Sequence, residues 1–401
     1  MRGWRHQCLV VALVAMTTSC CHAFLRVENP RRAARPASST ISPRSLSIKQ
    51  LQGQRDNNER LDKGFNLLEI ASGVVPQGQI VNTAKESWKF VWQRFMAELA
   101  PQDKEGNYQR PSYGFDNQLG TQRYPIEANR YQLYLGNPCP WCHRVKLVVN
   151  ILNLNNVIGV TTLIDDPVKA SRGGWVFANK AESKFNVQDL RELYDTLKPG
   201  YTGRCTAPLL VDLKTRTIVS NESKDIVRML PQLIGLLKDD DKVDIEMVPG
   251  NLQSKIDETN DWIYNEINNG VYQCGFATTQ AAFDKASQKV RTGLQKCNDI
   301  LANQNFICGD TLTESDILLL PTLLRFDAVY APLFMKSHLR LQCNYPHVYV
   351  YLLECWNQIE GVLESIDLND ACSSYYKQLF PLNPGGILPN KITAQSLGLE
   401  E

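Results

Sequence analysis

The alternation of strand-like and helix-like segments between Tyr131 and Leu237 constrains the fold of this chain more than any other feature of its sequence. Tyr131–Leu135 and Val157–Ile164 predict strands, and Pro140–Leu154 between them predicts a helix. The pattern continues with a helix, two strands paired as a hairpin and a last helix, over Val187–Leu197, Pro208–Asp212, Ile218–Ser220 and Ser223–Leu237.

This order, βαβ followed by α, β, β and α, is that of a thioredoxin-like domain, which we place at residues 129–237. The stretch 238–250 is charged and ends in Pro-Gly, which predicts a linker. Residues 251–390 have mostly helical apolar spacing and predict an all-helical domain with its C-terminal segment, followed by a tail over 391–401. The expected fold class is therefore an α/β thioredoxin-like domain followed by an all-α domain.

Residues 51–128 precede the α/β domain and show no independent core. One amphipathic helix is predicted at Thr83–Leu99, where apolar residues recur at helical spacing, at Trp88, Val91, Trp92, Phe95 and Leu99. A loop rich in Gly, Pro, Asn and aromatic residues follows it. We expect this region to be an extension that packs on the main body.

The first 50 residues have the composition of a two-part targeting sequence. Residues 1–23 have a basic start, a short apolar run and a small residue, Ala23, at which cleavage is expected, as in a signal peptide. Residues 24–50 are basic and acid-poor, with Phe24 at the junction, as in a transit peptide. This order resembles the plastid targeting sequences of algae with secondary plastids and predicts a plastid protein; secretion, with a basic linker, is the alternative. No other segment is expected to span a membrane.

Composition argues against several classes of function. The formal net charge is +1 over 401 residues, so charge gives no reason to expect a nucleic-acid partner. The twelve cysteines are too sparse for a disulfide scaffold and suit a reduced compartment. Only one CxxC pair is present, which offers two of the four ligands of a structural zinc site, so we expect no metal.

The strongest chemical signal is the segment NPCPWCHR at residues 137–144, between the first strand and its helix. Pro140 suits the first helical turn, because its missing N–H is no loss there. Cys139 then lies at the helix N-terminus, where free backbone N–H groups and the helix dipole favour the thiolate. Since the thiolate is the attacking species, we predict that Cys139 is a catalytic nucleophile.

Cys142 lies one helical turn beyond Cys139 and has two interpretations. It could resolve a mixed disulfide formed at Cys139, as in dithiol oxidoreductases. Alternatively it is a small apolar residue of the helix interior, which is common for a free cysteine.

Two further clusters suggest a peptide-like ligand. A proline before a thioredoxin-like strand is often cis, and Pro208 in Thr206-Ala207-Pro208 would leave backbone groups of Ala207 facing the ligand. The helix start at Asn221-Glu222-Ser223 offers N–H groups to a carboxylate, and Glu222 could accept from an ammonium group. The alternative for this second cluster is an ordinary helix cap.

Beyond these motifs, the chain is similar to the glutathionyl-hydroquinone reductases, the Xi class of glutathione transferases, over roughly residues 84–390. The resemblance is carried by NRYQLYLGNPCPWCHR (129–144), GGWVF (173–177), LYDTLKPGYTGRCTAPLLVD (193–212), IVSNESKDIVRML (218–230), DWIYNEINNGVYQCGFATTQ (261–280), TLLRFDAVY (322–330) and YYKQLFPLNPGGILP (375–389). It implies the glutathione transferase fold and a homodimer.

The resemblance also implies residue roles. Cys139 would be the nucleophile and Tyr272 the proton donor or acceptor at the quinol ring, while Tyr330 and Tyr375 would help to keep the pKa of Cys139 low. The residues that would bind glutathione are Trp175, Arg204, Cys205, Thr206, Ala207, Glu222 and Ser223.

The implied reaction removes glutathione from a glutathionyl-hydroquinone through a mixed disulfide at Cys139, with glutathione as co-substrate and no metal, flavin or nicotinamide. Its partners would be glutathione and aromatic quinol conjugates. Many family members have Ala at the position of Cys142, so this CPWC sequence keeps a glutaredoxin-like thiol transferase or dehydroascorbate reductase as an alternative. A non-catalytic glutathione- or chromophore-binding protein is the alternative from another class.

Overall fold

The computed structural model describes residues 75–111, 114–166 and 174–400. The predicted signal peptide (1–23), the transit-like segment (24–50) and the start of the extension lie outside these residues. Asn82–Glu401 form one compact unit, and the account below concerns that unit.

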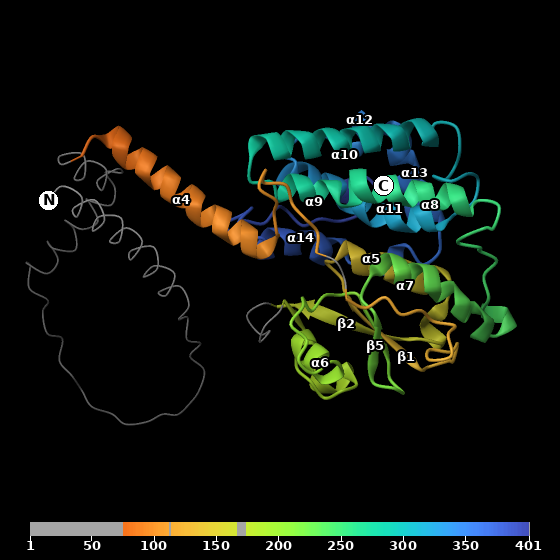
Figure 1. Cartoon of the computed structure of the whole chain (residues 1–401). Coiled ribbons are helices and arrows are strands. Elements are labelled where there is room, and N and C mark those ends of the chain that lie inside the picture. The colour runs from red at the N-terminus through yellow and green to blue at the C-terminus, as the bar shows by residue number, and fades with distance from the viewer. Residues whose placement is uncertain (1–74, 112–113, 167–173, 401) are drawn as a thin grey trace, which may run out of the picture. The chain divides into compact units, whose positions relative to one another are not determined.

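A five-stranded sheet lies at the centre of the α/β half, with the strand order β3-β2-β1-β4-β5 (Figure 1). The strands are β1 (Tyr131–Gly136), β2 (Gly159–Asp165), β3 (Trp175–Val176), β4 (Leu209–Asp212) and β5 (Thr217–Ser220). β1 is parallel to β2 and antiparallel to β4, and the pairs β2–β3 and β4–β5 are antiparallel. All six residues of β1 are buried, as expected of the central strand of a sheet covered on both faces.

Three helices cover this sheet. They are α5 (Pro140–Ile151), α6 (Leu190–Leu197) and α7 (Ser223–Met229). α5 and α7 pack together on the face toward the helical half, and α6 lies on the opposite face (Figure 1). The first turn of α5 therefore lies between the sheet and the helical half.

The predicted elements of this half are present, with two differences. The two-residue strand β3 was not predicted, because so short a run carries no periodicity. The helix predicted at Ser223–Leu237 ends at Met229 and continues as a 3₁₀ segment, Leu230–Leu236. Pro231 explains the change, since its ring has no N–H to donate and clashes with the carbonyl four residues earlier.

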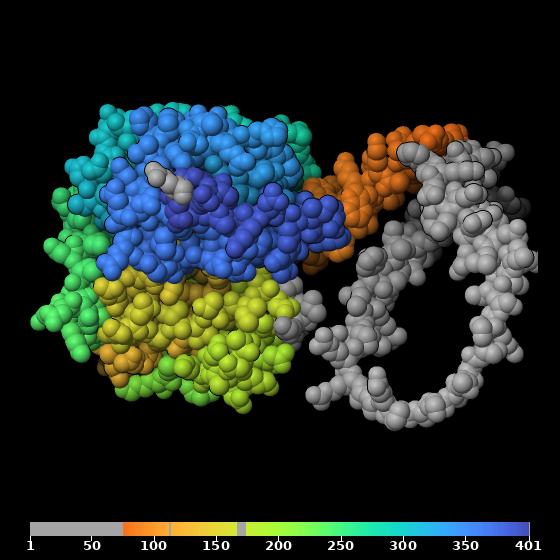
Figure 2. Space-filling model, turned by 180° about the vertical axis from the view of Figure 1, so that it is seen from behind, coloured from red at the N-terminus to blue at the C-terminus, as the bar shows by residue number. Residues whose placement is uncertain are grey.

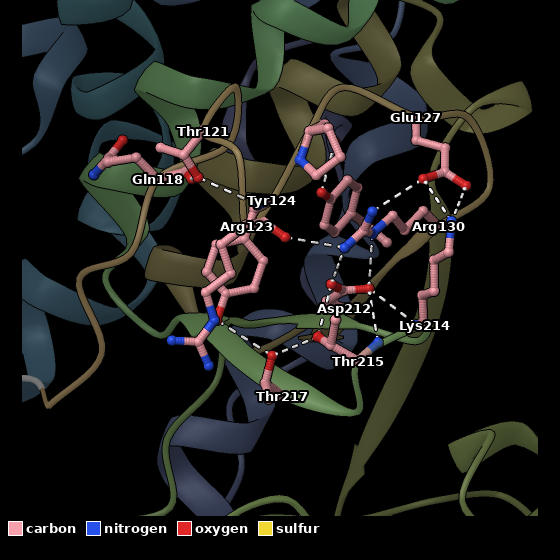
Figure 3. Close-up of polar contacts among 12 residues, drawn as sticks. Gln118, Thr121, Arg123, Tyr124, Glu127, Arg130, Asp212, Lys214, Thr215 and Thr217 are labelled. Atoms are coloured by element: carbon pink, nitrogen blue, oxygen red, sulfur yellow. Dashed lines mark hydrogen bonds and ion pairs between the residues drawn. The ribbon is translucent and has the colours of Figure 1, made fainter.

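A buried ion pair fastens the segment before β1 to the β4–β5 hairpin (Figure 3). Arg130 donates from Nε and Nη2 to the two carboxylate oxygens of Asp212, at 3.0 and 2.6 Å, and from Nη1 to Glu127 at 3.0 Å. Burial raises the pKa of Asp212, but the hydrogen bonds from Arg130 and Thr215 outweigh it and lower the pKa below its ordinary value. This bidentate pair holds the entry to β1, the strand that leads to Cys139.

The helical half consists of seven α-helices in the part of the chain that the structure describes: α8 (Gln253–Trp262), α9 (Gly270–Gly275), α10 (Gln280–Leu301), α11 (Glu314–Arg325), α12 (Leu341–Asn344), α13 (Pro346–Gln358) and α14 (Leu368–Gln378). Two π-helical segments, Ile263–Asn268 and Phe326–Phe334, follow α8 and α11. Such segments are rare and often lie at functional sites.

The stretch Glu314–Phe334 is long and apolar enough to cross a membrane by length and composition alone. The expectation that no segment after the N-terminal one passes this test is therefore wrong. However, 78% of its most apolar window is buried inside the protein, and it packs as a core helix.

The extension contributes helix α4 (Gln77–Leu99) and the loop that follows it. The predicted apolar stripe is only partly covered: Trp88 and Phe95 are about half exposed, and Met96 is the buried residue of the helix. Met96, Ala100 and Tyr108 pack against Phe276 of the helical half. The C-terminal part of α4 and the loop after it therefore make the apolar contact with the main body: Trp92 packs against this cluster and Phe95 against Phe380.

The last residues lie against α13. Tyr349 donates to the carbonyl of Gly398 at 2.7 Å, and Asn357 donates to that of Leu399 at 3.2 Å. In Figure 2 the dark blue atoms of this segment rest on the lighter blue atoms of the preceding helices. The stretch predicted as a tail is therefore packed on the helical half as far as Glu400, whose carboxylate accepts from Trp356.

Candidate active site

Cys139 is the N-cap residue of α5 and is partly buried. Pro140 occupies the first turn, as predicted, and the Cys139 carbonyl accepts from the N–H of His143 at 3.0 Å. The Cys139 side chain is not used for capping, and its thiol donates to the carbonyl of Ala207 at 3.7 Å. The sulfur therefore lies between the start of α5 and the residue before Pro208.

The surroundings of Cys139 favour its thiolate. A hydrogen bond from the Cys142 thiol and the backbone N–H groups of Cys142 and Trp141, with the charge of Arg325, lower the pKa of Cys139 to about 7, although burial opposes the shift. Burial raises the pKa of Cys142 well above its ordinary value. Of this pair, Cys139 is the thiol that loses its proton near neutral pH.

The turn at Ala207 has the predicted cis bond, between Ala207 and Pro208. Side chains around it hold Thr206: its carbonyl accepts from Tyr194 Oη at 2.8 Å, and its hydroxyl accepts from Asn221 Nδ2 at 3.3 Å. The carbonyl of Ala207 is thereby fixed opposite Cys139.

Glu222 and Ser223 lie at the start of α7, and there they make the contacts of a helix cap. The Glu222 carboxylate accepts from the N–H of Lys224 at 3.1 Å and from the Ser223 hydroxyl at 3.2 Å. Arg144 of α5 also donates to Ser223, at 3.4 Å. Capping accounts for these bonds and leaves further lone pairs of the Glu222 carboxylate available to a ligand.

The other predicted glutathione-binding residues are spread around the same region. The ring of Trp175 lies so close to Gly136 that a Cβ there would be 2.1 Å from it, which explains the glycine and places Trp175 beside the turn before Cys139. Arg204 donates to the carbonyls of Glu98 and Leu99, both at 3.2 Å, at the end of α4. The sulfur of Cys205 accepts from Arg191 at 3.3 Å.

The three predicted tyrosines meet in the helical half. The Tyr375 hydroxyl is 2.8 Å from that of Tyr272 and 2.9 Å from that of Tyr330, and the last two are 3.4 Å apart. Burial raises the pKa of each of the three phenols. All three therefore keep their protons near neutral pH.

Neither Tyr330 nor Tyr375 donates a hydrogen bond to the Cys139 sulfur in the described part of the chain. Their hydroxyls bond to each other and to Tyr272, so the geometry does not give them the predicted direct part in lowering the pKa of Cys139. Burial, above all, raises the pKa of Tyr272, and the charge of Cys139 adds to that rise.

Arg325 is a residue near the site that sequence reasoning missed. It is fully buried and donates to the carbonyl of Asn137 at 3.1 Å, to that of Pro321 at 3.0 Å and to Nδ1 of His143 at 3.0 Å. The only signal in the sequence is that it is the one charged residue in the apolar run 317–326. Its positive charge contributes to the low pKa of Cys139.

The contact with Arg325 fixes the protonation of His143. A guanidinium can only donate, so Nδ1 of His143 accepts and Nε2 carries the hydrogen. Nε2 then donates to the Ser365 hydroxyl at 2.7 Å, which donates in turn to the carbonyl of Val362. Burial and the charge of Arg325 hold the pKa of His143 well below its usual range, so His143 is neutral and structural here.

Two cavities lie near Trp141, the second residue after Cys139: Trp141 lines one of them, and two residues that pack against Trp141, Arg144 and Tyr264, line the other. One, of about 580 Å³, reaches Arg110, Arg204, Ala207 and Asn221. The other, of about 750 Å³, is more acidic and lies toward Glu222, Tyr264 and Glu314. We assign the smaller cavity to the chemistry, because it is the one that Ala207 lines, and Ala207 contacts the sulfur. Within the described residues no group of His, Cys, Asp and Glu side chains is arranged to hold a metal ion.

A thioredoxin-like α/β domain followed by an all-helical domain is the architecture of the glutathione transferase fold. Family models agree: residues 138–233 match the glutathione S-transferase N-terminal domain, and residues 280–353 match the glutathione S-transferase C-terminal domain.

Curated relatives and solved structures narrow the class. The chain is 36% identical to the glutathionyl-hydroquinone reductase YqjG of Escherichia coli, over 71% of this chain and 88% of that protein. It is 34% identical to the glutathione S-transferase omega-like 2 of Schizosaccharomyces pombe, over 71% of this chain and 93% of that protein. The crystal structure of the glutathione S-transferase Xi from Phanerochaete chrysosporium matches with a TM-score of 0.66 and 31% identity, over 72% of this chain and 94% of that one. The chain therefore belongs to the glutathionyl-hydroquinone reductase family, the Xi class of glutathione transferases.

The glutathione-bound structure of YqjG also matches, with a TM-score of 0.64 and 34% identity, over 70% of this chain and 93% of that one. That protein binds glutathione on the same fold. Glutathione-dependent transferase or oxidoreductase chemistry is thus the enzyme class that the relatives support.

Proposed function

We propose that the protein reduces glutathionyl-hydroquinones through a mixed disulfide between Cys139 and glutathione. The observation that carries the proposal is the low pKa of Cys139, at a helix N-terminus in the part of the fold that faces the tyrosine cluster. Relatives named glutathionyl-hydroquinone reductase support the substrate class.

In the first step the Cys139 thiolate attacks the glutathionyl sulfur. The bond between that sulfur and the ring carbon breaks, a Cys139–glutathione disulfide forms, and the electron pair of the broken bond stays on the ring carbon. The ring carbon needs a proton, and Tyr272 is the candidate donor because burial keeps its phenol protonated. The ring is reduced by two electrons, and the two sulfurs are oxidised.

In the second step the thiolate of another glutathione attacks the glutathionyl sulfur of the mixed disulfide. Oxidised glutathione leaves, and Cys139 returns as a thiolate, which its low pKa makes a good leaving group. The sum is one glutathionyl-hydroquinone plus one glutathione, giving the hydroquinone and oxidised glutathione.

Mass spectrometry of the full-length protein after treatment with a glutathionyl-hydroquinone tests this mechanism. We expect one glutathione adduct, on the peptide that contains Cys139, and its loss when excess glutathione is added. Absence of the adduct, or an adduct on another cysteine alone, would contradict the mechanism.

A second candidate, a dithiol thiol transferase, is favoured by one contact. The Cys142 thiol donates a hydrogen bond to Cys139, so the two sulfurs are close. Against it, Cys142 is 1% exposed and burial raises its pKa, which leaves little thiolate to attack a mixed disulfide. We therefore propose the monothiol route.

We also propose that residues 1–50 direct the protein to a plastid. The support is the order of a signal-like and then a basic, acid-poor segment with Phe24 at the junction. Residues 1–50 fused to a fluorescent protein, expressed in an alga with secondary plastids, should bring fluorescence into the plastid. Fluorescence confined to the medium and secretory compartments would favour secretion.

A further inference from the structure

The 580 Å³ cavity next to Ala207 has a cationic wall. Arg110 and Arg204 both line it, and none of the residues described around it is acidic. Burial raises the pKa of Tyr108, which lines the same cavity, and the charges of both arginines oppose that rise. Two positive charges therefore converge on one part of the cavity.

Arg110 reaches the cavity from the extension, outside the residues that match either family model. Its guanidinium lies over the ring of Trp141 at 3.6 Å from the centroid. Stacking on an aromatic face holds a guanidinium, and with it a positive charge, in place at the cavity wall. Arg110 is thus held against Trp141, which lies two residues after Cys139 in the chain.

Asn221 gives the cavity a buried acceptor. The residue is 2% exposed, and its Nδ2 donates to Tyr194 Oη at 3.2 Å and to Thr206 Oγ1 at 3.3 Å. Its Oδ1 is buried and has no hydrogen-bond partner among the residues that the structure describes. A buried carbonyl without a donor is unfavourable, so a ligand N–H that reached it would bind there preferentially.

We propose that Arg110 and Asn221 complete the glutathione site: Arg110, together with Arg204, binds one carboxylate of glutathione, and Asn221 Oδ1 accepts an N–H of the tripeptide. The inference rests on the proposed function, since it concerns the ligand of the same cysteine. Glutathione supplies the matching groups, two terminal carboxylates and amide N–H donors. The carbonyl that Cys139 contacts belongs to Ala207, on the cavity wall, so a tripeptide joined to this sulfur would extend into the cavity. The extension is then part of the ligand site.

Calorimetric titration with S-methylglutathione tests the inference, because this ligand cannot form a disulfide. Full-length Arg110→Met should bind it about tenfold or more weakly than the wild type, the usual cost of a lost charge-assisted hydrogen bond. The matched control is Arg216→Met, which removes a guanidinium stacked at 4.8 Å on Phe185 in the β4–β5 hairpin region and should leave binding unchanged.

Two S-methylated analogues identify the carboxylate. One carries an amide in place of the glycyl carboxylate, and the other has a 4-aminobutyryl group in place of γ-glutamyl. The wild type should bind one of them about tenfold or more weakly than S-methylglutathione, and Arg110→Met should bind that analogue no more weakly than the wild type does. If Arg110→Met weakened the binding of both analogues by the same factor relative to the wild type, the role of Arg110 would be overturned, as it would be by wild-type affinity of Arg110→Met for S-methylglutathione.

Asn221→Ala separates a ligand role from a structural one. If Oδ1 serves the ligand, S-methylglutathione should bind several-fold more weakly, even at a temperature at which the variant is still folded. Unchanged binding with a lower unfolding temperature would overturn the role of Asn221. A wild type that does not bind S-methylglutathione would overturn the proposed function itself, which keeps the two failures distinct.

Discussion

Around the Cys139 sulfur, the α/β half of the site presents mainly backbone groups, whereas the helical half presents buried side chains. The N–H groups of Trp141 and Cys142 and the carbonyl of Ala207 come from the main chain. From the other half come the Tyr272 phenol, whose pKa the charge of Cys139 helps to raise, and the guanidinium of Arg325, which donates to the carbonyl of Asn137. Backbone groups survive most substitutions, so single substitutions should damage the helical half of the site more, the two cysteines excepted.

The largest expected effect is that of Cys139→Ala, which should reduce turnover of glutathionyl-hydroquinone to the uncatalysed rate because no other thiol can replace the nucleophile. Cys142→Ser should keep most of the activity, since the second glutathione supplies the resolving sulfur. Steady-state assays of both variants decide this. Equal losses in the two, with a trapped disulfide between residues 139 and 142 in the wild type, would establish a dithiol route instead.

Tyr272→Phe should lower kcat by roughly 10²- to 10⁴-fold, the usual contribution of a general acid. Formation of the mixed disulfide should slow to a similar degree, because the departing ring carbon then lacks its proton donor. Rapid-quench measurement of the first turnover would report this. Tyr349→Phe is the matched control, since among the described residues the Tyr349 hydroxyl donates to the carbonyl of Gly398 and to no other group. If Tyr272→Phe reacted as fast as this control, Tyr272 would have no part in the chemistry.

Arg325→Gln should raise the pKa of Cys139, though by less than loss of the hydrogen bonds to the sulfur would, because removing a nearby positive charge disfavours the thiolate. Arg325→Lys keeps the charge and should keep most of the shift, even if lost hydrogen bonds lower its stability. The midpoint of alkylation rate against pH measures the pKa in each variant. If the Gln and Lys variants gave the same midpoint, the charge of Arg325 would not contribute to the low pKa of Cys139.

The smallest effect concerns the other two tyrosines. Changing Tyr330 and Tyr375 together to Phe should leave the Cys139 pKa within about half a unit, because their hydroxyls bond each other and Tyr272 rather than the sulfur. This differs from the role that family resemblance suggested for them. A rise of a full unit in the double variant would restore that role.

The same contrast explains what could be predicted from the sequence. The position of Cys139 at a helix N-terminus and the cis proline follow from local patterns, a CxxC motif between strand and helix and a proline before a strand, and the structure confirms both. The tyrosine cluster joins residues up to 103 positions apart, so only the family resemblance pointed to it.

Other features of the site could not be predicted from the sequence around them. The π-helical segment Phe326–Phe334, which carries Tyr330, contains Pro332, but a proline predicts a kink or the end of a helix rather than a wider helical turn. Arg325 stood out only as a single charge in an apolar run, and its partners, at Asn137 and His143, are more than 180 residues away. The contact of Arg204 with the end of α4 depends on how the extension packs, which periodicity does not encode.

The central claim is that the fold holds Cys139 as a thiolate near neutral pH. Alkylation of the full-length wild type with iodoacetamide, followed peptide by peptide against pH, measures this directly, and the exposed Cys343 serves as an internal reference for the reagent. Because the folded-state pKa of Cys139 is lowered, its rate should rise as pH increases and reach half its plateau near pH 7. A midpoint at or above that of an ordinary thiol, about 8.5, would contradict the account.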